Sequence, residues 1–227
     1  MNLKSLEELI AYYGINRVCH FAPFRNLHQI VAGSAILSSE RVAKEFPGAF
    51  NPTDPLRLDN KRSHVCATIE YPNVWYLDKL EKEADLYPNY AVFLLSPAAL
   101  AIAGTLFCVR NAAGAGAGQS PGPVGMAAMY APRVVGKRVY SRTGRHPKWL
   151  PTDMQAEILI PDAIPLELVT GVLVKSNDVA ATLVGQLSAA KTVLGLPIYV
   201  SPETFDKNFI AGLRTGGPRP HEELYQG

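Results

Sequence analysis

The stretch MQAEILI, residues 154–160, predicts a short β-strand that carries one carboxylate. Successive side chains of a strand point to opposite faces, so Gln155, Glu157 and Leu159 share one face and the apolar alternate positions share the other. The apolar set is typical of a core-facing surface. Glu157 therefore lies on the opposite face, either as a solvated strand residue or as a functional group.

The residues before this strand are rich in positive charge. The whole chain has 22 basic and 20 acidic residues and a net charge of +2, so any strong positive field is local. Residues 86–152 contain no Asp or Glu, yet they carry Arg110, Arg133, Lys137, Arg138, Arg142, Arg145 and Lys148. We therefore expect one face of the protein to bind an anionic substrate or a polyanion.

Length and composition indicate one domain. The chain has 227 residues, 48% of them hydrophobic, and can bury a substantial core. We expect a single domain over residues 1–215 and a disordered tail over residues 216–227, GGPRPHEELYQG.

Cysteine usage and hydrophobic segments favour the cytoplasm. The three cysteines stand in apolar runs without the CxxC spacing of zinc or redox motifs, so we expect buried thiols in a reducing compartment and no metal site. Residues 1–14 predict an amphipathic helix and not a signal peptide. The apolar window 90–109 is interrupted by Ser96-Pro97 and Gly104, so we expect no membrane span.

Hydrophobic patterning and turn residues predict a mixture of short elements. The expected strands are residues 17–21, 64–69, 91–95, 106–109, 153–160, 169–174 and 198–200. The expected helices are residues 1–14, 27–32, 73–85, 124–130, 177–194 and 202–213, and a further helix is expected to begin at Pro97 with Ser96 as its cap. Because these elements show no regular βαβ alternation, they indicate an α+β fold with a split, mostly antiparallel sheet and surrounding helices.

Three connections are expected to be long. Residues 46–62 and 111–122 are rich in Pro or Gly and predict irregular loops. Residues 132–152 predict an exposed loop with at most one short strand, near residues 138–141.

Two motifs resemble known ADP-ribosyltransferases. The Gln155-x-Glu157 spacing after a cationic loop resembles their catalytic element, in which the acid contacts the nicotinamide ribose and the residue two before it orients the acceptor. The segment VCHFAPFRNLHQI, residues 18–30, resembles the opening of the DarT family of DNA ADP-ribosyltransferase toxins: a His-containing strand, an Asn-Leu pair six residues later, and a helix ending in glycine.

The resemblance continues in order along residues 17–175. Residues 57–60 are similar to the family's arginine-containing segment before its second strand, and residues 109–113, VRNAA, are similar to its Asn-Ala-Ala segment. Pro23 stands where many members have a second histidine. The N-terminal helix and the Gly/Ala-rich loop also depart from the commoner pattern, which leaves the subgroup and its target base open.

The resemblance implies an enzyme that uses NAD as co-substrate and no metal. It implies transfer of ADP-ribose to a nucleobase of single-stranded DNA, as the toxin of a toxin-antitoxin pair whose antitoxin, a hydrolase or an inhibitor, is a separate protein. Guanine is slightly favoured over thymine, because the Gln-x-Glu element resembles that of guanine-modifying transferases.

The resemblance also implies roles for residues on the NAD side. Glu157 stabilises the positive charge that develops on the ribose. His20 and Asn26 bind NAD, and Asn26 is also expected to cap the helix over residues 27–32. Arg57 is a further catalytic residue that pairs with the pyrophosphate through its planar guanidinium, and Arg62 is an alternative for that role.

On the acceptor side, Gln155 is expected to hydrogen-bond the amide edge of the base. Residues 133–149, which we call the acceptor loop, mix cations with aromatic rings, a combination suited to holding phosphates while an unpaired base stacks. The candidate contacts are Arg142, Arg145, His146, Lys148 and Trp149.

Two other readings of the residues remain open. The acceptor could be RNA or protein, for which the cationic loop would be less specific. The chain could also be a non-catalytic nucleic-acid-binding module, in which Glu157 is incidental.

Overall fold

The structure is a computed structural model that describes residues 5–49, 59–83, 89–114 and 117–227. Its centre is a sheet built from β1 (Val18–Pro23), β3 (His64–Ile69), β4 (Tyr90–Leu95), β5 (Leu106–Cys108), β6 (Gln119–Pro121), β9 (Glu157–Pro161), β11 (Val169–Val174), β12 (Ile198–Val200) and β13 (Glu223–Leu224).

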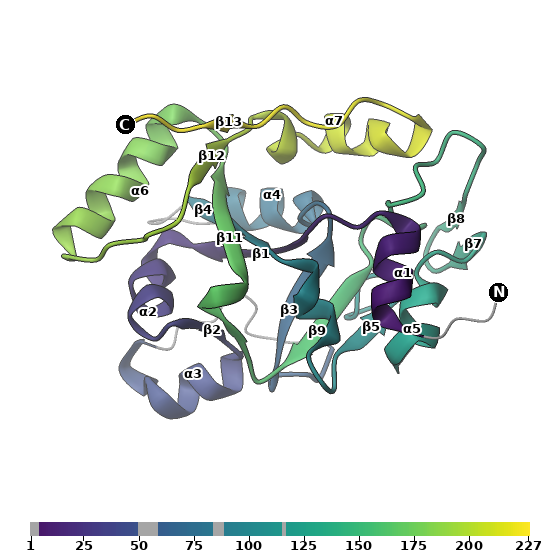
Figure 1. Cartoon of the computed structure of the whole chain (residues 1–227), viewed down its shortest axis with the longest axis horizontal. Coiled ribbons are helices and arrows are strands. Elements are labelled where there is room, and N and C mark those ends of the chain that lie inside the picture. Colours follow the sequence, from purple (N-terminus) through teal and green to yellow (C-terminus); the bar gives the residue numbers. More distant parts are fainter. Residues whose placement is uncertain (1–4, 50–58, 84–88, 115–116) are drawn as a thin grey trace.

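The strand order of this sheet is β13-β12-β11-β4-β1-β3-β9-β5-β6 (Figure 1). Among these described strands every neighbouring pair is antiparallel except β11 and β12. The expected α+β fold with a mostly antiparallel sheet is confirmed. Two small ladders pair β2 (Ala35–Leu37) with β10 (Ala163–Pro165) and β7 (Arg133–Val135) with β8 (Val139–Ser141).

The sheet is split between β1 and β3. β1 pairs with β4 along its whole length, from Val18 to Pro23, but it pairs with β3 only at Val18 and Cys19. Beyond Cys19 the two strands diverge. His20, the next residue, therefore lies where the sheet opens.

Helices cover both faces of the sheet. The main core packs one face against α1 (Leu6–Tyr13), α2 (Leu27–Ala32), α5 (Gly122–Ala128) and α6 (Asn177–Ala189), which contribute buried residues such as Leu9, Leu27, Met126 and Leu183. On the other face, smaller clusters involve α4 (Val74–Glu83) and α7 (Lys207–Gly212). Helix α3 (Ser39–Glu45), which the sequence pattern did not predict, follows β2.

The expected N-terminal helix is confirmed as α1. The Ser5 side chain accepts a hydrogen bond from the Glu8 N–H at its start, and Gly14 ends it in the left-handed conformation, with φ 69°. Glycine adopts this backbone geometry without a Cβ penalty.

The predicted strand over residues 153–160 starts later than expected. A turn occupies its first residues, because the Ala156 N–H bonds the Asp153 carbonyl and the Gln155 N–H bonds the Asp153 side chain at 2.9 Å. Asp side chains commonly stabilise such turns. Gln155 therefore precedes the strand, and the expectation that it shares a strand face with Glu157 is wrong.

The acceptor loop is more structured than expected. Instead of at most one strand, β7 and β8 form a hairpin, and the Gly136 N–H bonds the Arg138 carbonyl in its turn at 2.9 Å. β8 matches the one short strand expected near residues 138–141, whereas β7 was not predicted, because a short, mostly exposed strand carries a weak hydrophobic pattern.

The C-terminal residues also differ from the expected disordered tail. β13 pairs with β12, and Pro220 is buried. Arg219 and Glu222 form ion pairs with Glu70 and Arg17, at 2.7 and 2.6 Å. These partners are distant in sequence, so composition alone could not reveal them.

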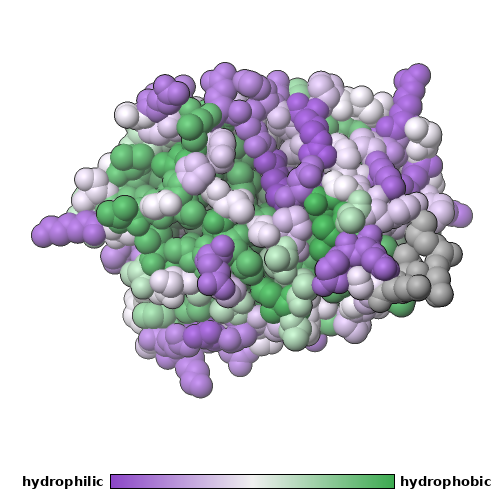
Figure 2. Space-filling view, viewed as in Figure 1, coloured by the Kyte–Doolittle hydropathy of each residue, from purple (hydrophilic) through white to green (hydrophobic). Residues whose placement is uncertain are grey.

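Figure 2 shows polar residues gathered along the top of the molecule, where this segment runs. Within the described part of the chain no helix is long and apolar enough to cross a membrane.

Candidate active site

Glu157 is the first residue of β9, between β3 and β5 in the sheet. Its carboxylate accepts hydrogen bonds from Asn111 Nδ2 at 2.9 Å and from the Ala112 N–H at 2.8 Å. The Ala113 N–H in turn donates to Asn111 Oδ1 at 3.0 Å, which holds the asparagine in a turn. Two N–H donors on one short segment therefore fix the orientation of the Glu157 carboxylate.

Cys108 pairs with Glu157 across the β5–β9 ladder, and the pKa of its thiol depends on the charged groups nearby. Burial, followed by the negative charges of Glu157 and Asp59, raises the pKa of the Cys108 thiol to about 12, whereas Lys61 opposes this shift. The thiol stays protonated at neutral pH, so it is a structural group and not a nucleophile. Glu157, Asp59 and Lys61 thus form one charged neighbourhood.

His20 lies at the split of the sheet. Its Nδ1 is 2.7 Å from the Cys66 carbonyl oxygen. Because a carbonyl only accepts, Nδ1 carries the proton in this contact. Cys66 pairs with Leu159 of β9, two residues from Glu157. The structure therefore brings His20 and Glu157 to the same region, on strands separated by β3 alone.

Asn26 immediately precedes α2, but the expected helix cap is wrong. Its backbone is already helical, with φ −89° and ψ −15°, because it ends a 3₁₀ turn over Phe24–Asn26. An N-cap residue normally has an extended backbone. Within the described structure its side chain makes no capping hydrogen bond, which leaves Asn26 a candidate for NAD binding only.

Of the two candidate arginines, Arg57 lies outside the described residues. Arg62 is exposed in the turn before β3, and its carbonyl accepts hydrogen bonds from the Glu40 N–H and from Ser39 Oγ. Nearby, Asp59 accepts from the Lys61 N–H at 3.1 Å, and its other carboxylate oxygen lies 3.7 Å from Cys66 Sγ. The sequence pattern did not single out Asp59, although it lies in the segment that resembles the family.

Two of the predicted acceptor contacts hold their own loop together. Arg142 donates to the Leu150 carbonyl at 2.7 Å and to the Pro147 carbonyl at 2.8 Å. Nε2 of the buried His146 lies 3.2 Å from the carbonyls of Leu150 and Pro151. Burial, helped by the positive charge of Arg142, lowers the pKa of His146, so this imidazole is neutral near pH 7.

The remaining predicted acceptor residues present aromatic and cationic groups. Lys148 Nζ lies 3.5 Å above the centre of the Tyr12 ring. Trp149 meets the Tyr71 ring edge-on, with centroids 5.8 Å apart, and the Arg219 guanidinium lies 4.0 Å from the centre of the indole. Arg145 is exposed, and the partly buried Gln155 sits in the turn just before Glu157.

Arg110 joins the acceptor loop to the Glu157 segment. Its Nη1 donates to the Val135 carbonyl of β7 at 2.6 Å, and Asn111 is the next residue along the chain. The approach is closest at Gly136, where a Cβ would lie 2.5 Å from Arg110 Nη1 and would force the guanidinium to shift. Sequence reasoning missed the roles of Arg110, Asn111 and Ala112, although VRNAA was the available signal.

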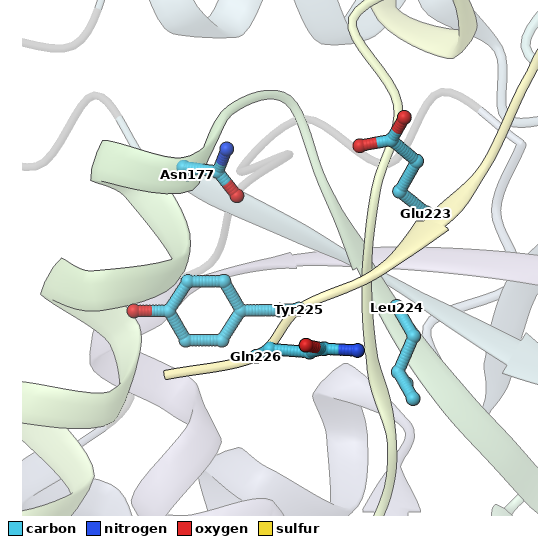
Figure 3. A pocket seen from close by; sticks show the side chains of 5 residues that line it. All are labelled: Asn177, Glu223, Leu224, Tyr225 and Gln226. Carbon is cyan, nitrogen blue, oxygen red and sulfur yellow. The ribbon is translucent and has the colours of Figure 1, made fainter.

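An open pocket lies between the start of α6 and the C-terminal residues (Figure 3). It is lined by Asn177, Glu223, Leu224, Tyr225 and Gln226, which do not belong to the site around Glu157. Across the described ranges, no three His, Cys, Asp or Glu side chains are grouped so as to hold a metal ion.

Comparison with known proteins identifies one family. A family model described as "DarT: ssDNA thymidine ADP-ribosyltransferase, DarT" matches residues 19–206. No curated protein matches the sequence.

Solved structures share the fold. The DarT of Thermus sp. 2.9 in complex with ADP-ribosylated ssDNA has a TM-score of 0.58 and 15% identity, over 85% of this chain and 97% of that chain. The same protein in complex with NAD+ has a TM-score of 0.51 and 14% identity, over 84% of this chain and 98% of that chain. DarTG of Thermosipho africanus, in complex with ADP-ribose, has a TM-score of 0.54 and 13% identity, over 84% of this chain and 51% of that chain. The predicted ADP-ribosyltransferase fold is thereby confirmed.

Proposed function

We propose that this chain, which belongs to the DarT family of ssDNA thymidine ADP-ribosyltransferases, transfers ADP-ribose from NAD to a base of single-stranded DNA. The observation that carries the proposal is the Glu157 carboxylate, held by Asn111 and Ala112 at the start of β9. A carboxylate fixed in this way can stabilise a developing positive charge without reorganising.

The reaction breaks the bond between nicotinamide and C1′ of its ribose. The electron pair leaves with nicotinamide, and the ribose becomes cationic, as in glycoside hydrolysis. Glu157 stabilises this cation through the 2′-hydroxyl. A base nitrogen then attacks C1′ and Glu157 accepts its proton, which gives ADP-ribosylated DNA, nicotinamide and one proton.

The NAD side of the site comes from the N-terminal third of the chain. His20, oriented by the Cys66 carbonyl, hydrogen-bonds a ribose hydroxyl, and Asn26 lies on the segment that follows β1. Arg57 or Arg62 pairs with the pyrophosphate, since a guanidinium matches phosphate geometry. The solved complexes of Thermus sp. 2.9 DarT with NAD+ and with carba-NAD+ support NAD as the co-substrate.

For the acceptor base we favour thymine. The family description names thymidine, whereas the sequence motif slightly favoured guanine. A Gln amide offers one acceptor and donors side by side, and both guanine and thymine present a carbonyl next to a ring N–H. Gln155 therefore suits either base, and the family description supports thymine. Because a paired base hides this edge, the acceptor is single-stranded or extruded.

We further propose that the protein acts as a cytoplasmic toxin that a separate antitoxin neutralises. Modification of bases on exposed single strands would block DNA copying. An antitoxin could remove the ADP-ribose or inhibit the enzyme. Co-expression with neighbouring genes that restores growth, compared with expression of this chain alone, tests this role.

Labelling of defined oligonucleotides tests the reaction. The protein is incubated with NAD and a set of single-stranded DNAs that each lack one base. Loss of labelling only when thymine is missing supports the proposal. Labelling that persists without thymine and disappears without guanine would establish guanine instead.

The same assay separates the alternatives. Matched RNA and protein acceptors test the second reading of the sequence. A non-catalytic module would bind DNA in a salt-dependent manner but release no nicotinamide from NAD.

A further inference from the structure

Segments outside the family match pack against the acceptor loop. The match covers residues 19–206. Helix α1 precedes it, and the C-terminal strap, which we define as residues 213–225, follows it. In Figure 1 the strap runs along the top of the molecule, from α7 through β13.

Two arginines of the strap contact aromatic rings of the loop. The Arg219 guanidinium lies 4.0 Å from the centre of the Trp149 indole, and the Arg214 guanidinium lies 4.5 Å from the centre of the Tyr140 ring. Tyr140 belongs to β8 of the hairpin, so the strap touches both halves of the acceptor loop. Guanidinium groups stack favourably on aromatic faces.

The strap is anchored by a buried charge. Arg219 Nη1 lies 2.7 Å from Glu70 Oε2, and the Glu70 side chain is 0% exposed. Glu70 also accepts a hydrogen bond from the Asn16 N–H. Removing the partner of a buried carboxylate is strongly destabilising, because the charge is left uncompensated. Lifting Arg219 away is therefore unfavourable.

A second ion pair fixes the strap a few residues later. Arg17 donates to both carboxylate oxygens of Glu222, at 2.6 and 2.7 Å, and its Nε donates to the Glu70 carbonyl at 2.8 Å. The two strap anchors therefore meet at Glu70. Bidentate pairs of this kind fix geometry as well as supplying energy.

Trp149 is held in one orientation as a result. Arg219 covers a face of the indole, and Tyr71, the neighbour of Glu70, meets the ring edge-on. The adjacent Lys148 lies over Tyr12 of α1. Both terminal segments thus restrain the part of the loop that carries Trp149.

We propose that Arg219 is a positioning residue for single-stranded DNA, acting through Trp149. The inference rests on the proposed function, because it takes Trp149 as a stacking platform for an unpaired base. By fixing the indole before DNA arrives, Arg219 lowers the ordering cost of binding. The strap that carries Arg219 lies outside the residues that the family model matches.

The test uses neutral variants that avoid an unpaired buried charge. Glu70→Gln with Arg219→Gln replaces the ion pair by an amide pair and removes the cation from the indole. Glu70→Gln alone keeps Arg219 and is the matched control. Glu223→Gln changes an exposed strap residue outside these contacts. Arg219→Lys, which keeps the charge but loses the planar group, is a further variant should the double variant fold poorly.

Four readouts are measured: affinity for a fluorescent single-stranded oligonucleotide, KM for NAD, the melting temperature, and acrylamide quenching of Trp149 in a Trp75→Phe background. We expect the double variant to bind DNA about threefold to tenfold more weakly than Glu70→Gln. We also expect stronger quenching of Trp149, with KM for NAD and the melting temperature unchanged relative to Glu70→Gln.

Equal DNA affinity in the double variant and its control would overturn the proposal. Tighter DNA binding by the double variant than by its control would also overturn the proposal, because the strap would then obstruct DNA binding. The fluorescence and binding readouts need no turnover. If the wild type released no nicotinamide, the proposed reaction would fail while these readouts still decided the role of Arg219.

Discussion

Asn111 and Glu157 are joined by a hydrogen bond of 2.9 Å between Nδ2 of the amide and Oε1 of the carboxylate, although the residues are 46 positions apart. The bond links the loop after β5 to the start of β9. Asn111 also follows Arg110, which bonds the β7 strand of the acceptor loop. The Glu157 carboxylate and the acceptor loop are therefore linked through two adjacent residues.

Removing the carboxylate tests the centre of the site. We expect Glu157→Gln to reduce transfer and nicotinamide release about 10²-fold to 10³-fold or more, because a neutral amide cannot stabilise the ribose cation. The fold should be retained with a modest drop in melting temperature, since Gln can still accept from the Ala112 N–H but its NH2 group would face the donor Nδ2 of Asn111. Activity near the wild-type level would reject Glu157 as the catalytic group.

Removing the Asn111 side chain tests how strongly catalysis depends on the orientation of the Glu157 carboxylate. We expect Asn111→Ala to lower kcat about tenfold with a smaller change in KM for NAD, because one hydrogen bond to a charged group is lost. Asn111→Asp should be worse, because it places a second negative charge beside Glu157. Equal activity of the two variants would contradict this order.

The close approach of Arg110 to the hairpin predicts a glycine requirement. Gly136→Ala places a Cβ 2.5 Å from Arg110 Nη1 and should destabilise the protein by about 1 kcal/mol, with reduced transfer as the arginine shifts. Gly144→Ala in the same loop is the control, because its Cβ would meet nothing within 4 Å. Urea unfolding of both variants measures the difference, and equal stabilities would refute it.

Substitutions of Arg142 and Arg145 should have different effects, the first on the stability of the fold and the second on DNA binding. Arg142→Lys loses the simultaneous bonds to the carbonyls of Leu150 and Pro147, so we expect a loss of about 1 to 2 kcal/mol in unfolding free energy. Arg145→Gln should leave stability unchanged but reduce the salt dependence of DNA binding. A stable Arg142→Lys variant would argue that those bonds contribute little.

The buried His146 side chain should make the free energy of unfolding depend on pH. Burial lowers its pKa in the folded protein, so as the pH falls through about 6.5 the unfolded chain binds more protons than the folded one. The free energy of unfolding should therefore fall as the pH drops below the pKa of histidine in the unfolded chain, about 6.5. His146→Gln, whose amide can bond the same carbonyls, should flatten this part of the profile. An unchanged slope in urea midpoints would exclude His146 as the cause.

The elements that local patterning predicted well share a physical cause. Strands β3, β11 and β12 have the predicted bounds, because short apolar runs end at turn residues. α2 ends before Gly33, as expected. The predicted DarT resemblance is confirmed by the match over residues 19–206. Such signals lie within a few neighbouring residues.

The features that patterning missed depend on partners far along the chain. The bond from Asn111 to Glu157 and the ion pair between Glu70 and Arg219 join residues 46 and 149 positions apart. Arg142 and His146 look like DNA contacts in the sequence, but folding turns their polar atoms toward backbone carbonyls of residues 147–151. A side chain's type limits the bonds that it can make, whereas the packing of the sheet, loop and strap selects which partners it meets.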